Sequence, residues 1–303
     1  MKGSQSRQIR TTGKSYTIRM PKNVCIYLDE HCMKFVSLMR DMNLAIHSQN
    51  RSVILDFSET EEMTAGAAVM LFAEVTRSQL LTGLPNVITI IRPKNPNLWG
   101  LMRNSGLWDA IKPGGEKKLQ GLWEKNCPFA SGNDPDAHLA STLNSFRNAR
   151  PNLPRRFDSA IQEAILNVVH HAYEYNRNLP TDSIGTRWWQ YAAITKEDVR
   201  FTICDLGIGI PNKILYMPEN RHLPHGHCIE KAMEDGFSTL FRRGRGMGSR
   251  DLKRPVVNTE AESFSIFSNN GIYSYIQNRE PICGDRPACL PGTVVEWKME
   301  VSA

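Results

Sequence analysis

A carboxylate, a carboxamide and an imidazole recur at four-residue spacing in the segment from Arg156 to Tyr175. Glu163, Asn167 and His171 stand at positions i, i+4 and i+8, so we expect one helix to carry them on one face. The Asn167 oxygen can complete an octahedral Mg²⁺ shell, and the Glu163 carboxylate can orient or deprotonate an attacking water. An exposed polar stripe on an amphipathic helix explains the same spacing without any chemistry.

A second candidate is the segment "CDLGIGIP". Asp205 ends an expected strand, and Gly207 and Gly209 follow at alternate positions, where glycine lets a backbone approach a ligand closely. The Asp205 carboxylate can accept a hydrogen bond from an exocyclic amine, as at the floor of an adenine pocket. An ordinary turn at the end of a strand explains the same residues.

A third candidate, "RRGRGMGSRDLKR", precedes an expected helix whose N-terminal N–H groups could hold phosphates. The positions concerned are Arg242, Arg243, Gly244, Arg245, Gly246, Met247, Gly248 and Lys253. No GxxxxGK[ST] motif occurs in the chain, so this segment is not a P-loop. Gly292 and Thr293 then open the strand-like "TVVEW" and by themselves indicate a plain turn.

The order of these segments resembles the nucleotide-binding boxes of the GHKL ATPase superfamily, which includes gyrase-type topoisomerases, heat-shock chaperones, sensor histidine kinases and mismatch-repair ATPases. ExxxNxxxH, DxGxG, GxGxG and GT follow one another between Glu163 and Thr293. "EAILNVVHHAY" and "DLGIGIP" look especially like the histidine-kinase and anti-sigma-factor kinase branch. The resemblance covers residues 150–300 and implies the Bergerat fold, a two-layer α/β sandwich that binds ATP between helices and a mobile lid.

Carried onto this sequence, the resemblance implies that Asn167 ligands the Mg²⁺ of bound ATP, with Glu163 beside it as the water-activating or phosphotransfer base. It implies that Asp205 recognises the adenine amino group and that Gly207 and Gly209 line the pocket. The other nucleotide-binding positions would be His171, Arg243, Gly244, Gly246, Met247, Gly248 and Thr293, with a lid from about Pro211 to Arg245. The chain departs from the family pattern at "MGSRDLKR", which replaces an apolar run, and at the insertion "QNREPICGDRPACLP".

Two other chemistries compete for the same region. The cluster "RHLPHGHC" offers His222, His225, His227 and Cys228, which are side chains that zinc favours, although their spacing matches no standard site. A conventional histidine autokinase would need a dimerising helical hairpin with an exposed histidine, and residues 113–150 offer only His138. Metal binding at residues 222–228 stays open, and autokinase activity is disfavoured.

The elements that must position these residues fall into two groups. Before residue 113, strands alternate with helices, which indicates an α/β layer. Its expected strands are Tyr16–Met20, Ser52–Phe57 and Val87–Arg92, and its expected helices are Glu30–Ser48, Ala65–Leu81 and Asn97–Ile111.

The second group consists of helices followed by antiparallel strands, which indicates an α+β domain. We expect helices over Asp136–Asn148 and Arg156–Tyr175, a hairpin of Trp188–Ile194 with Val199–Asp205, and strands over Ser263–Phe267, Ile272–Ile276 and Val294–Met299. The predicted organisation is a basic disordered arm (1–14), an α/β domain (15–112), a linker (113–135) and an ATP-binding domain (136–303).

The first domain, through "VILDFSETEEMTAGAAVMLFAEV", resembles the STAS domain of anti-sigma-factor antagonists. In that family a GHKL partner kinase phosphorylates a serine at the turn that opens a helix. Aligned on Gly66, Thr64 takes the acceptor position, and Met63 replaces the usual aspartate. A phosphate is favoured at a helix N-terminus, although a simple N-cap role for Thr64 is the favoured explanation of its position.

Composition limits the class of protein. The chain has 303 residues, 41% of them hydrophobic, and a formal net charge of +6. Its longest apolar run, about nine residues from Ala65 to Ala73, is far shorter than the roughly 18 that a membrane helix needs, so we expect no membrane partner. Seven cysteines without a CxxC pair indicate free thiols and a cytoplasmic protein. The basic residues of the N-terminal segment are Lys2, Arg7, Arg10, Lys14 and Arg19.

The sequence therefore predicts a cytoplasmic regulator that binds Mg-ATP and acts on or through a protein partner. A Ser/Thr protein kinase, a slow ATPase coupled to lid closure, and a non-catalytic nucleotide-dependent switch all fit. A homodimer is compatible with each of them. Nucleic-acid binding ranks low, because the Lys and Arg residues are not interleaved with aromatic residues as in single-strand binders.

Overall fold

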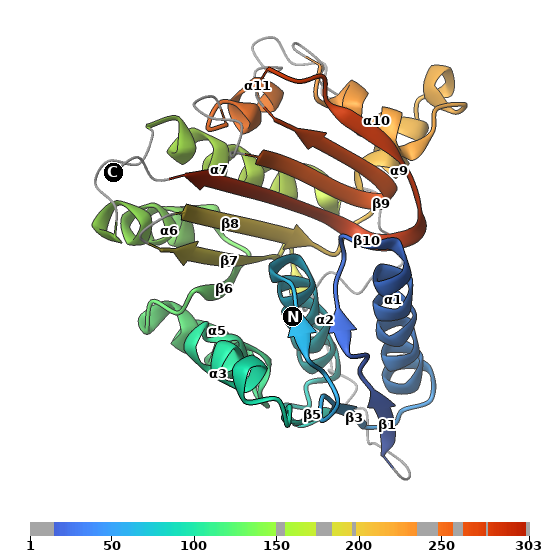
Figure 1. Cartoon of the computed structure of the whole chain (residues 1–303), viewed down its shortest axis with the longest axis vertical. Helices are drawn as coiled ribbons and strands as arrows, with labels where there is room; N and C mark the ends of the chain where they lie inside the picture. Colours follow the sequence, from blue (N-terminus) through green and yellow to red (C-terminus); the bar gives the residue numbers. More distant parts are fainter. Residues whose placement is uncertain are drawn as a thin grey trace, which may run out of the picture. The chain divides into compact units, whose positions relative to one another are not determined.

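The computed structural model describes residues 15–149, 155–173, 184–195, 198–234, 248–256, 263–276 and 278–300. Its contacts divide the chain into two compact units, Met1–Lys125 and Asn126–Ala303. Both units mix helices with strands, as Figure 1 shows, so the expectation of α/β architecture is confirmed at that level. Among the described residues, no helix is long and apolar enough to cross a membrane.

The N-terminal unit contains a parallel sheet of three strands in the order β1-β3-β5 and a short parallel pair, β2-β4. The strands are β1 (Tyr16–Arg19), β2 (Asn23–Val24), β3 (Val53–Asp56), β4 (Glu62–Met63) and β5 (Ile88–Ile91). The helices are α1 (Asp29–Asn43), α2 (Ala65–Thr82), α3 (Pro96–Asn104), α4 (Leu107–Ile111) and α5 (Glu116–Glu124).

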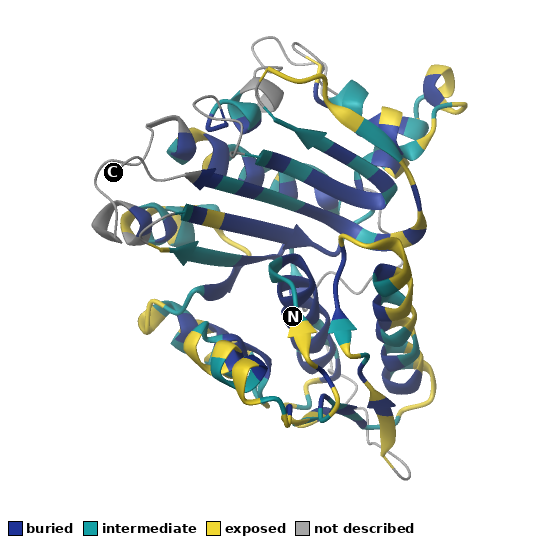
Figure 2. Cartoon of the chain, in the orientation of Figure 1, coloured by how far each residue is buried: buried dark blue, intermediate teal, exposed yellow. Residues whose placement is uncertain are grey.

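Helix α2 is buried along nearly its whole length, as Figure 2 shows. Its one buried acid, Glu74, accepts hydrogen bonds from Arg77 at 2.7 Å and Asn43 at 3.0 Å. A buried carboxylate needs such partners, because burying a charge without an ion pair or hydrogen bonds is strongly unfavourable.

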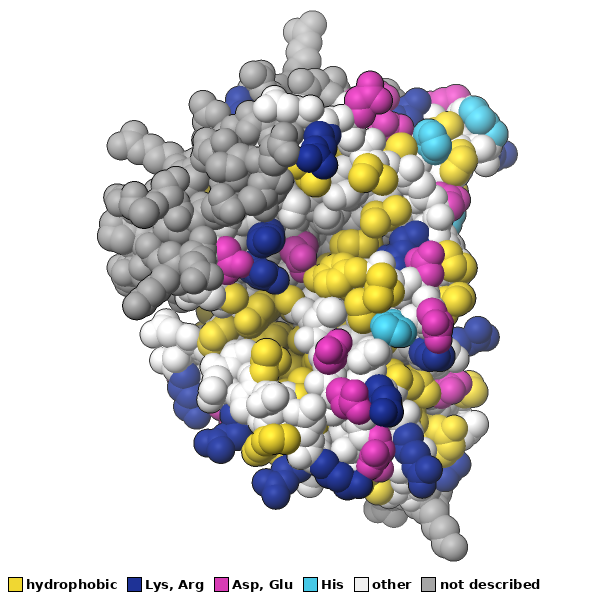
Figure 3. All heavy atoms as spheres, in the orientation of Figure 1, with side chains coloured by type: hydrophobic (Ala, Val, Ile, Leu, Met, Phe, Trp, Pro, Cys, Tyr) yellow, Lys and Arg dark blue, Asp and Glu magenta, His cyan; other side chains and the backbone are white. Residues whose placement is uncertain are grey.

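The surface charges of the N-terminal unit are mixed in sign. Figure 3 shows Lys and Arg side chains interleaved with Asp and Glu over the part that carries β1, β3 and β5. Exposed ion pairs account for this pattern: Lys22–Glu61 at 3.0 Å, Lys94–Glu59 at 2.6 Å and Lys112–Asp109 at 2.6 Å. Part of the positive charge on these described residues is therefore paired with acidic side chains.

Three predicted elements of the N-terminal half differ in the structure. The helix expected over Asn97–Ile111 is two helices, because Gly106 adopts a positive φ of 80° that ends α3 and starts α4. The helix expected over Glu30–Ser48 ends in a π-helical turn, η1 (Leu44–Ser48). The stretch 113–135, expected as a linker, contains α5 and strand β6 (Phe129–Gly132), and the boundary between the units falls inside it.

The C-terminal unit is built on a five-stranded antiparallel sheet in the order β6-β7-β8-β10-β9. Besides β6, its strands are β7 (Trp188–Ile194), β8 (Asp198–Asp205), β9 (Ser263–Tyr275) and β10 (Ile282–Glu300). Its helical segments are α6 (Pro135–Ala149), α7 (Arg155–Asn167), the π-turn η2 (Val168–Ala172), α9 (Ile210–Leu215), the 3₁₀-turn η3 (Pro218–Asn220), α10 (His225–Ala232) and α11 (Gly248–Lys253).

Helix α7 runs behind this sheet in Figure 1, and an aromatic core joins the two layers. Val199, Phe201 and Ile203 alternate along β8, so all three point to one face of the sheet. Phe157 of α7 packs edge-on against Phe201 and Trp297, with ring centroids 6.2 and 6.4 Å apart. The core therefore fixes α7 over β8 and β10, and with it the position of every residue that α7 carries.

The last third of the chain is more regular than the sequence predicts. The strands expected at Ser263–Phe267 and Ile272–Ile276 form one strand, β9. Much of the predicted insertion before Gly292 belongs to β10, which pairs with β9 through register shifts between Asp285 and Thr293. Pairing with β9 makes this stretch a strand, so its own sequence need not show the alternation of a strand.

The first part of the predicted lid is packed rather than open. Within residues 211–234, Ile214, Cys228 and Ile229 are buried, and α10 lies against β9. A mobile lid would have few buried contacts, and the described part of the predicted lid does not fit that expectation. The remainder of the predicted lid, residues 235–245, lies outside the described residues.

Removing one ring from the aromatic core should destabilise the C-terminal unit. We expect Phe157→Ala to lower the free energy of unfolding by about 3–5 kcal/mol, because the residue is fully buried. Tyr216→Ala, at a side chain 69% exposed, should change it by no more than about 0.5 kcal/mol. Urea unfolding of both variants measures the difference, and equal values would contradict the packing described.

Candidate functional site

Asp205 is a buried carboxyl at the end of β8. Its residue is 5% exposed, and its strand partner is Thr293 of β10. The backbone N–H of Gly207 donates to Asp205 Oδ1 at 2.8 Å. Burial raises the pKa of Asp205 to about 7, although hydrogen bonds from the Gly207 and Thr293 N–H groups and from the Thr293 hydroxyl act to lower it. At neutral pH the protonated form of this carboxyl is therefore substantially populated.

The glycines near Asp205 are required by contacts within the chain. A Cβ on Gly207 would lie 2.1 Å from the carbonyl oxygen of Ala172, and one on Gly292, whose φ is +66°, would lie 2.1 Å from the carbonyl oxygen of Asp205. Gly209 has a φ of +82° and faces the side chain of Asn269. The three glycines thus let β10, the π-turn η2 and the turn after β8 close around one carboxyl.

Ser268 of β9 connects the same segments. Its hydroxyl donates to the carbonyl oxygen of Gly292 and lies 2.9 Å from the Thr293 hydroxyl, while Ile210 N–H donates to it at 2.9 Å. The next residue, Asn269, is 7% exposed, and its Oδ1 has no hydrogen-bond partner among the described residues. Sequence reasoning missed both residues, because "FSNNG" matches no motif and becomes meaningful only when β9 pairs with β10.

Glu163, Asn167 and His171 lie on one continuous helical segment, as the spacing predicts, but its geometry changes at Asn167. Helix α7 ends there and the π-turn η2 follows. In a regular α-helix His171 would stand about 80° round the axis from Glu163. The wider π-turn reduces that offset, and such turns occur often at functional sites.

The π-turn joins the helix to the Asp205 turn. The Ala172 carbonyl accepts a hydrogen bond from Ile208 N–H at 2.8 Å. The Tyr173 hydroxyl accepts from Leu206 N–H at 3.2 Å and donates to the carbonyl oxygen of Arg187 at 2.6 Å. The structure therefore brings the end of the helix next to Asp205.

His171 lies in this junction and has a partner within the chain. Lys213 Nζ of α9 lies 2.7 Å from His171 Nδ1. Because an ammonium group can only donate, Nδ1 accepts this bond. Glu163 and Asn167 are half-buried and lie further back along the same segment, Glu163 by about two turns from His171.

Most of the predicted phosphate-binding segment lies outside the described residues. Arg243, Gly244, Gly246 and Met247 lie outside the described residues, and Gly248 is the first residue of α11. Lys253, at the other end of α11, donates to the carbonyl oxygen of Met233 at 3.0 Å. Its ammonium group thus holds α11 against the end of α10.

Thr64, the candidate phosphoacceptor of the N-terminal unit, occupies the N-cap position of α2. Its hydroxyl makes no capping hydrogen bond, and its Oγ1 is buried without a partner among the described residues. Instead, the Tyr27 hydroxyl accepts the N–H of Gly66 at 3.3 Å. The Thr64 side chain therefore does not cap α2 through a hydrogen bond. Because its hydroxyl is buried, a phosphoryl donor could reach it only after local opening of the structure.

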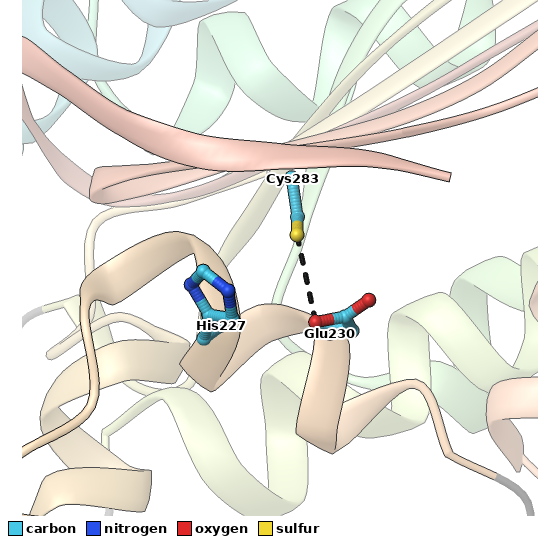
Figure 4. Close-up of side chains that lie close together, drawn as sticks. All are labelled: His227, Glu230 and Cys283. Carbon is cyan, nitrogen blue, oxygen red and sulfur yellow. Dashed lines mark hydrogen bonds between the residues drawn. The ribbon is translucent and has the colours of Figure 1, made fainter. Parts of the chain in front are cut away.

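The histidine cluster at residues 222–228 does not converge as a set. His225 accepts a hydrogen bond from Asn270 N–H through Nδ1 at 3.2 Å, and Cys228 is fully buried. His227 instead lies near Glu230 and Cys283 (Figure 4), and their ligand atoms are all within 4.8 Å of one another. Sequence spacing could not find this group, because Cys283 comes from β10.

No protein-family model matches the chain, and no curated protein matches it.

The buried carboxyl of Asp205 should make stability depend on pH in a specific direction. Its pKa rises from 3.8 to about 7 on folding, so the folded state holds the proton more tightly, and stability is lost as pH rises towards 7. Between about pH 5 and pH 8 this carboxyl should lower the free energy of unfolding by about 1–3 kcal/mol.

Asp205→Asn removes this titration and serves as the comparison. Urea unfolding of both proteins at the two pH values gives the contribution of Asp205 as the difference between their pH dependences. Identical pH dependences would mean that the carboxyl is not buried as described.

Proposed function

We propose that residues 136–303 form a Bergerat-fold ATP-binding domain of the GHKL type and that the chain is a cytoplasmic regulator that binds Mg-ATP. An antiparallel sheet covered on one face by α7 supports the two-layer sandwich. The observation that carries the proposal is the buried carboxyl of Asp205, held between β10 and the end of the helix that carries Glu163 and Asn167.

The chemistry of that carboxyl fits an adenine base. A pKa near 7 means that burial disfavours the ionised form of this carboxyl. A ligand that donates a hydrogen bond would stabilise that ionised form, because it would give the carboxylate a partner. The adenine amine is such a donor. The Thr293 hydroxyl already contacts the carboxyl and adds a group that can both donate and accept beside the base.

The phosphate end would lie towards α7. Asn167 and Glu163 follow one another by one helical turn on the segment that reaches the Asp205 turn. We propose that the Asn167 side-chain oxygen is a ligand of Mg²⁺ and that Glu163 orients or activates the attacking group. ATP would then be used for Ser/Thr phosphorylation of a protein partner or for slow hydrolysis.

A non-catalytic, nucleotide-dependent switch is the alternative, and two observations favour it. Glu163 already makes an interaction within the chain, so its carboxylate is not held solely for an attacking group. Residues 211–234, expected to form much of a mobile lid, are packed by Ile214, Cys228 and Ile229. In this alternative, bound ATP fixes a surface that a partner recognises.

The proposal for the N-terminal unit is a STAS-like domain with Thr64 as its phosphoacceptor. The support is the position of Thr64 at the N-terminus of α2, directly after a strand.

Single-turnover incubation of the full chain with γ-labelled ATP separates the kinase, the ATPase and the non-catalytic switch. Label on Thr64 or on a partner indicates a kinase, free phosphate an ATPase, and unchanged ATP a switch.

Recognition of the adenine amine should make the protein discriminate between ATP and ITP, which differ at position 6 of the base. At a pH well above 7, where the Asp205 carboxyl is ionised, we expect wild-type protein to bind ATP at least about 100-fold more tightly, because the carbonyl of ITP would face a carboxylate that has no proton to donate. Asp205→Asn should weaken ATP binding roughly 5- to 150-fold and remove most of the discrimination.

Calorimetry measures both affinities. Asp198→Asn, at the other end of β8, is the matched control and should retain the wild-type preference. Equal affinity of the wild-type protein for ATP and ITP, or unchanged discrimination in Asp205→Asn, would contradict the assignment.

Glu163→Gln should separate binding from turnover. The variant keeps the side-chain volume, so ATP affinity should change less than about threefold, whereas loss of a general base should lower turnover by about 10²–10⁴-fold. Asp158→Asn on the same helix is the control. Undiminished turnover in Glu163→Gln would remove Glu163 from the chemistry and leave the non-catalytic switch as the better description.

A further inference from the structure

We infer that His227, Glu230 and Cys283 bind one zinc ion between α10 and β10. This site is separate from the proposed nucleotide site, whose ligands are oxygen atoms around Asn167. The inference rests on the convergence of three side chains with zinc-binding atoms from two elements (Figure 4).

The two ligands on α10 stand three residues apart, so they lie on the same side of the helix one turn from each other. Cys283 lies on β10, where it pairs with Tyr273 of β9. Figure 4 shows the Cys283 thiol reaching from β10 towards Glu230, with His227 beside it on α10. The thiol lies 3.5 Å from Glu230 Oε2 and donates to it.

These separations suit a tetrahedral ion. Bonds of about 2.0–2.3 Å to zinc place neighbouring ligand atoms about 3.3–3.8 Å apart. The contact between Cys283 and Glu230 already has that length. The other pairs lie within 4.8 Å, and the side chain of His227, the exposed member of the group, would have to adjust for its ring nitrogen to bind the ion.

The two elements are held in position without a metal. A Cβ on Gly226 would lie 2.4 Å from the backbone of Gly284, and Gly226 N–H donates to Asp285 Oδ1 at 2.7 Å. A Cβ on Gly271 would lie 2.7 Å from the carbonyl oxygen of His225. Direct backbone contacts therefore fix the first turn of α10 against β9 and β10, and zinc binding need not reorganise the fold.

The ligand set selects the metal class. A thiolate and an imidazole suit zinc, whereas Mg²⁺ and Ca²⁺ prefer oxygen ligands. Three protein ligands leave one tetrahedral position for water or a fourth ligand. A bound ion would clamp α10 to the sheet, so zinc should raise the thermal midpoint of the C-terminal unit.

The test uses the full chain and Co²⁺ as a spectroscopic substitute for zinc. We expect one equivalent of Co²⁺ to bind with thiolate-to-cobalt charge-transfer absorption, and Zn²⁺ to displace it. Cys283→Ala should abolish that absorption, and His227→Gln and Glu230→Gln should each weaken binding at least about tenfold. Cys289→Ala, at an exposed cysteine on the same strand, is the matched control and should bind as the wild type does.

A second measurement needs no substitution. Zn²⁺ should slow alkylation of Cys283 at least tenfold, with no effect on Cys289, as mapped by mass spectrometry. Charge-transfer absorption that persists in Cys283→Ala or disappears in Cys289→Ala would overturn the inference. So would equal alkylation of Cys283 with and without zinc.

Discussion

Burial of one carboxyl, that of Asp205, constrains the arrangement of the C-terminal unit around it. An ionisable group removed from water is tolerated only if hydrogen-bond donors surround it. Here the donors come from the turn after β8 and from β10, so these segments must stay in register. Glycines at 207 and 292 allow the backbone of η2 and β10 to come within contact of that turn.

The rest of the unit holds those segments in place. Aromatic packing among Phe157, Phe201 and Trp297 fixes α7 against the sheet, and the π-turn after α7 brings the Ala172 carbonyl to the Ile208 N–H. Ser268 connects β9 to the same turn. Burial of the Asp205 carboxyl is unfavourable, and the apolar core a few residues away stabilises the segments that surround it.

Continuous apolar runs and a hairpin were predictable from the sequence. The apolar run of β3, the long helix α2 and the hairpin of β7 with β8 lie close to their predicted bounds. Asp205, Gly207 and Thr293 were also selected from sequence, and the structure brings them together. Their role in nucleotide binding stays a prediction.

What sequence reasoning missed depends on contacts between distant residues. Strand β6 is a stretch of four residues that becomes a strand by pairing with β7, and the middle of β10 is ordered by β9. The π-turn at Asn167 has no signature in residue spacing. The group of His227, Glu230 and Cys283 combines residues of α10 with a residue of β10, and these two elements are far apart in the sequence. Residue spacing within one segment could therefore not reveal it.

The central claim is that the buried carboxyl of Asp205 is the adenine receptor, and its protonation can be observed directly. Difference infrared spectroscopy of wild-type protein against Asp205→Asn isolates the band of the protonated carboxyl through a pH titration. The account predicts a pKa near 7 without nucleotide, and a clear decrease when ATP donates its amine to the carboxylate. A pKa near the ordinary aspartate value, or one that ATP leaves unchanged, would contradict it.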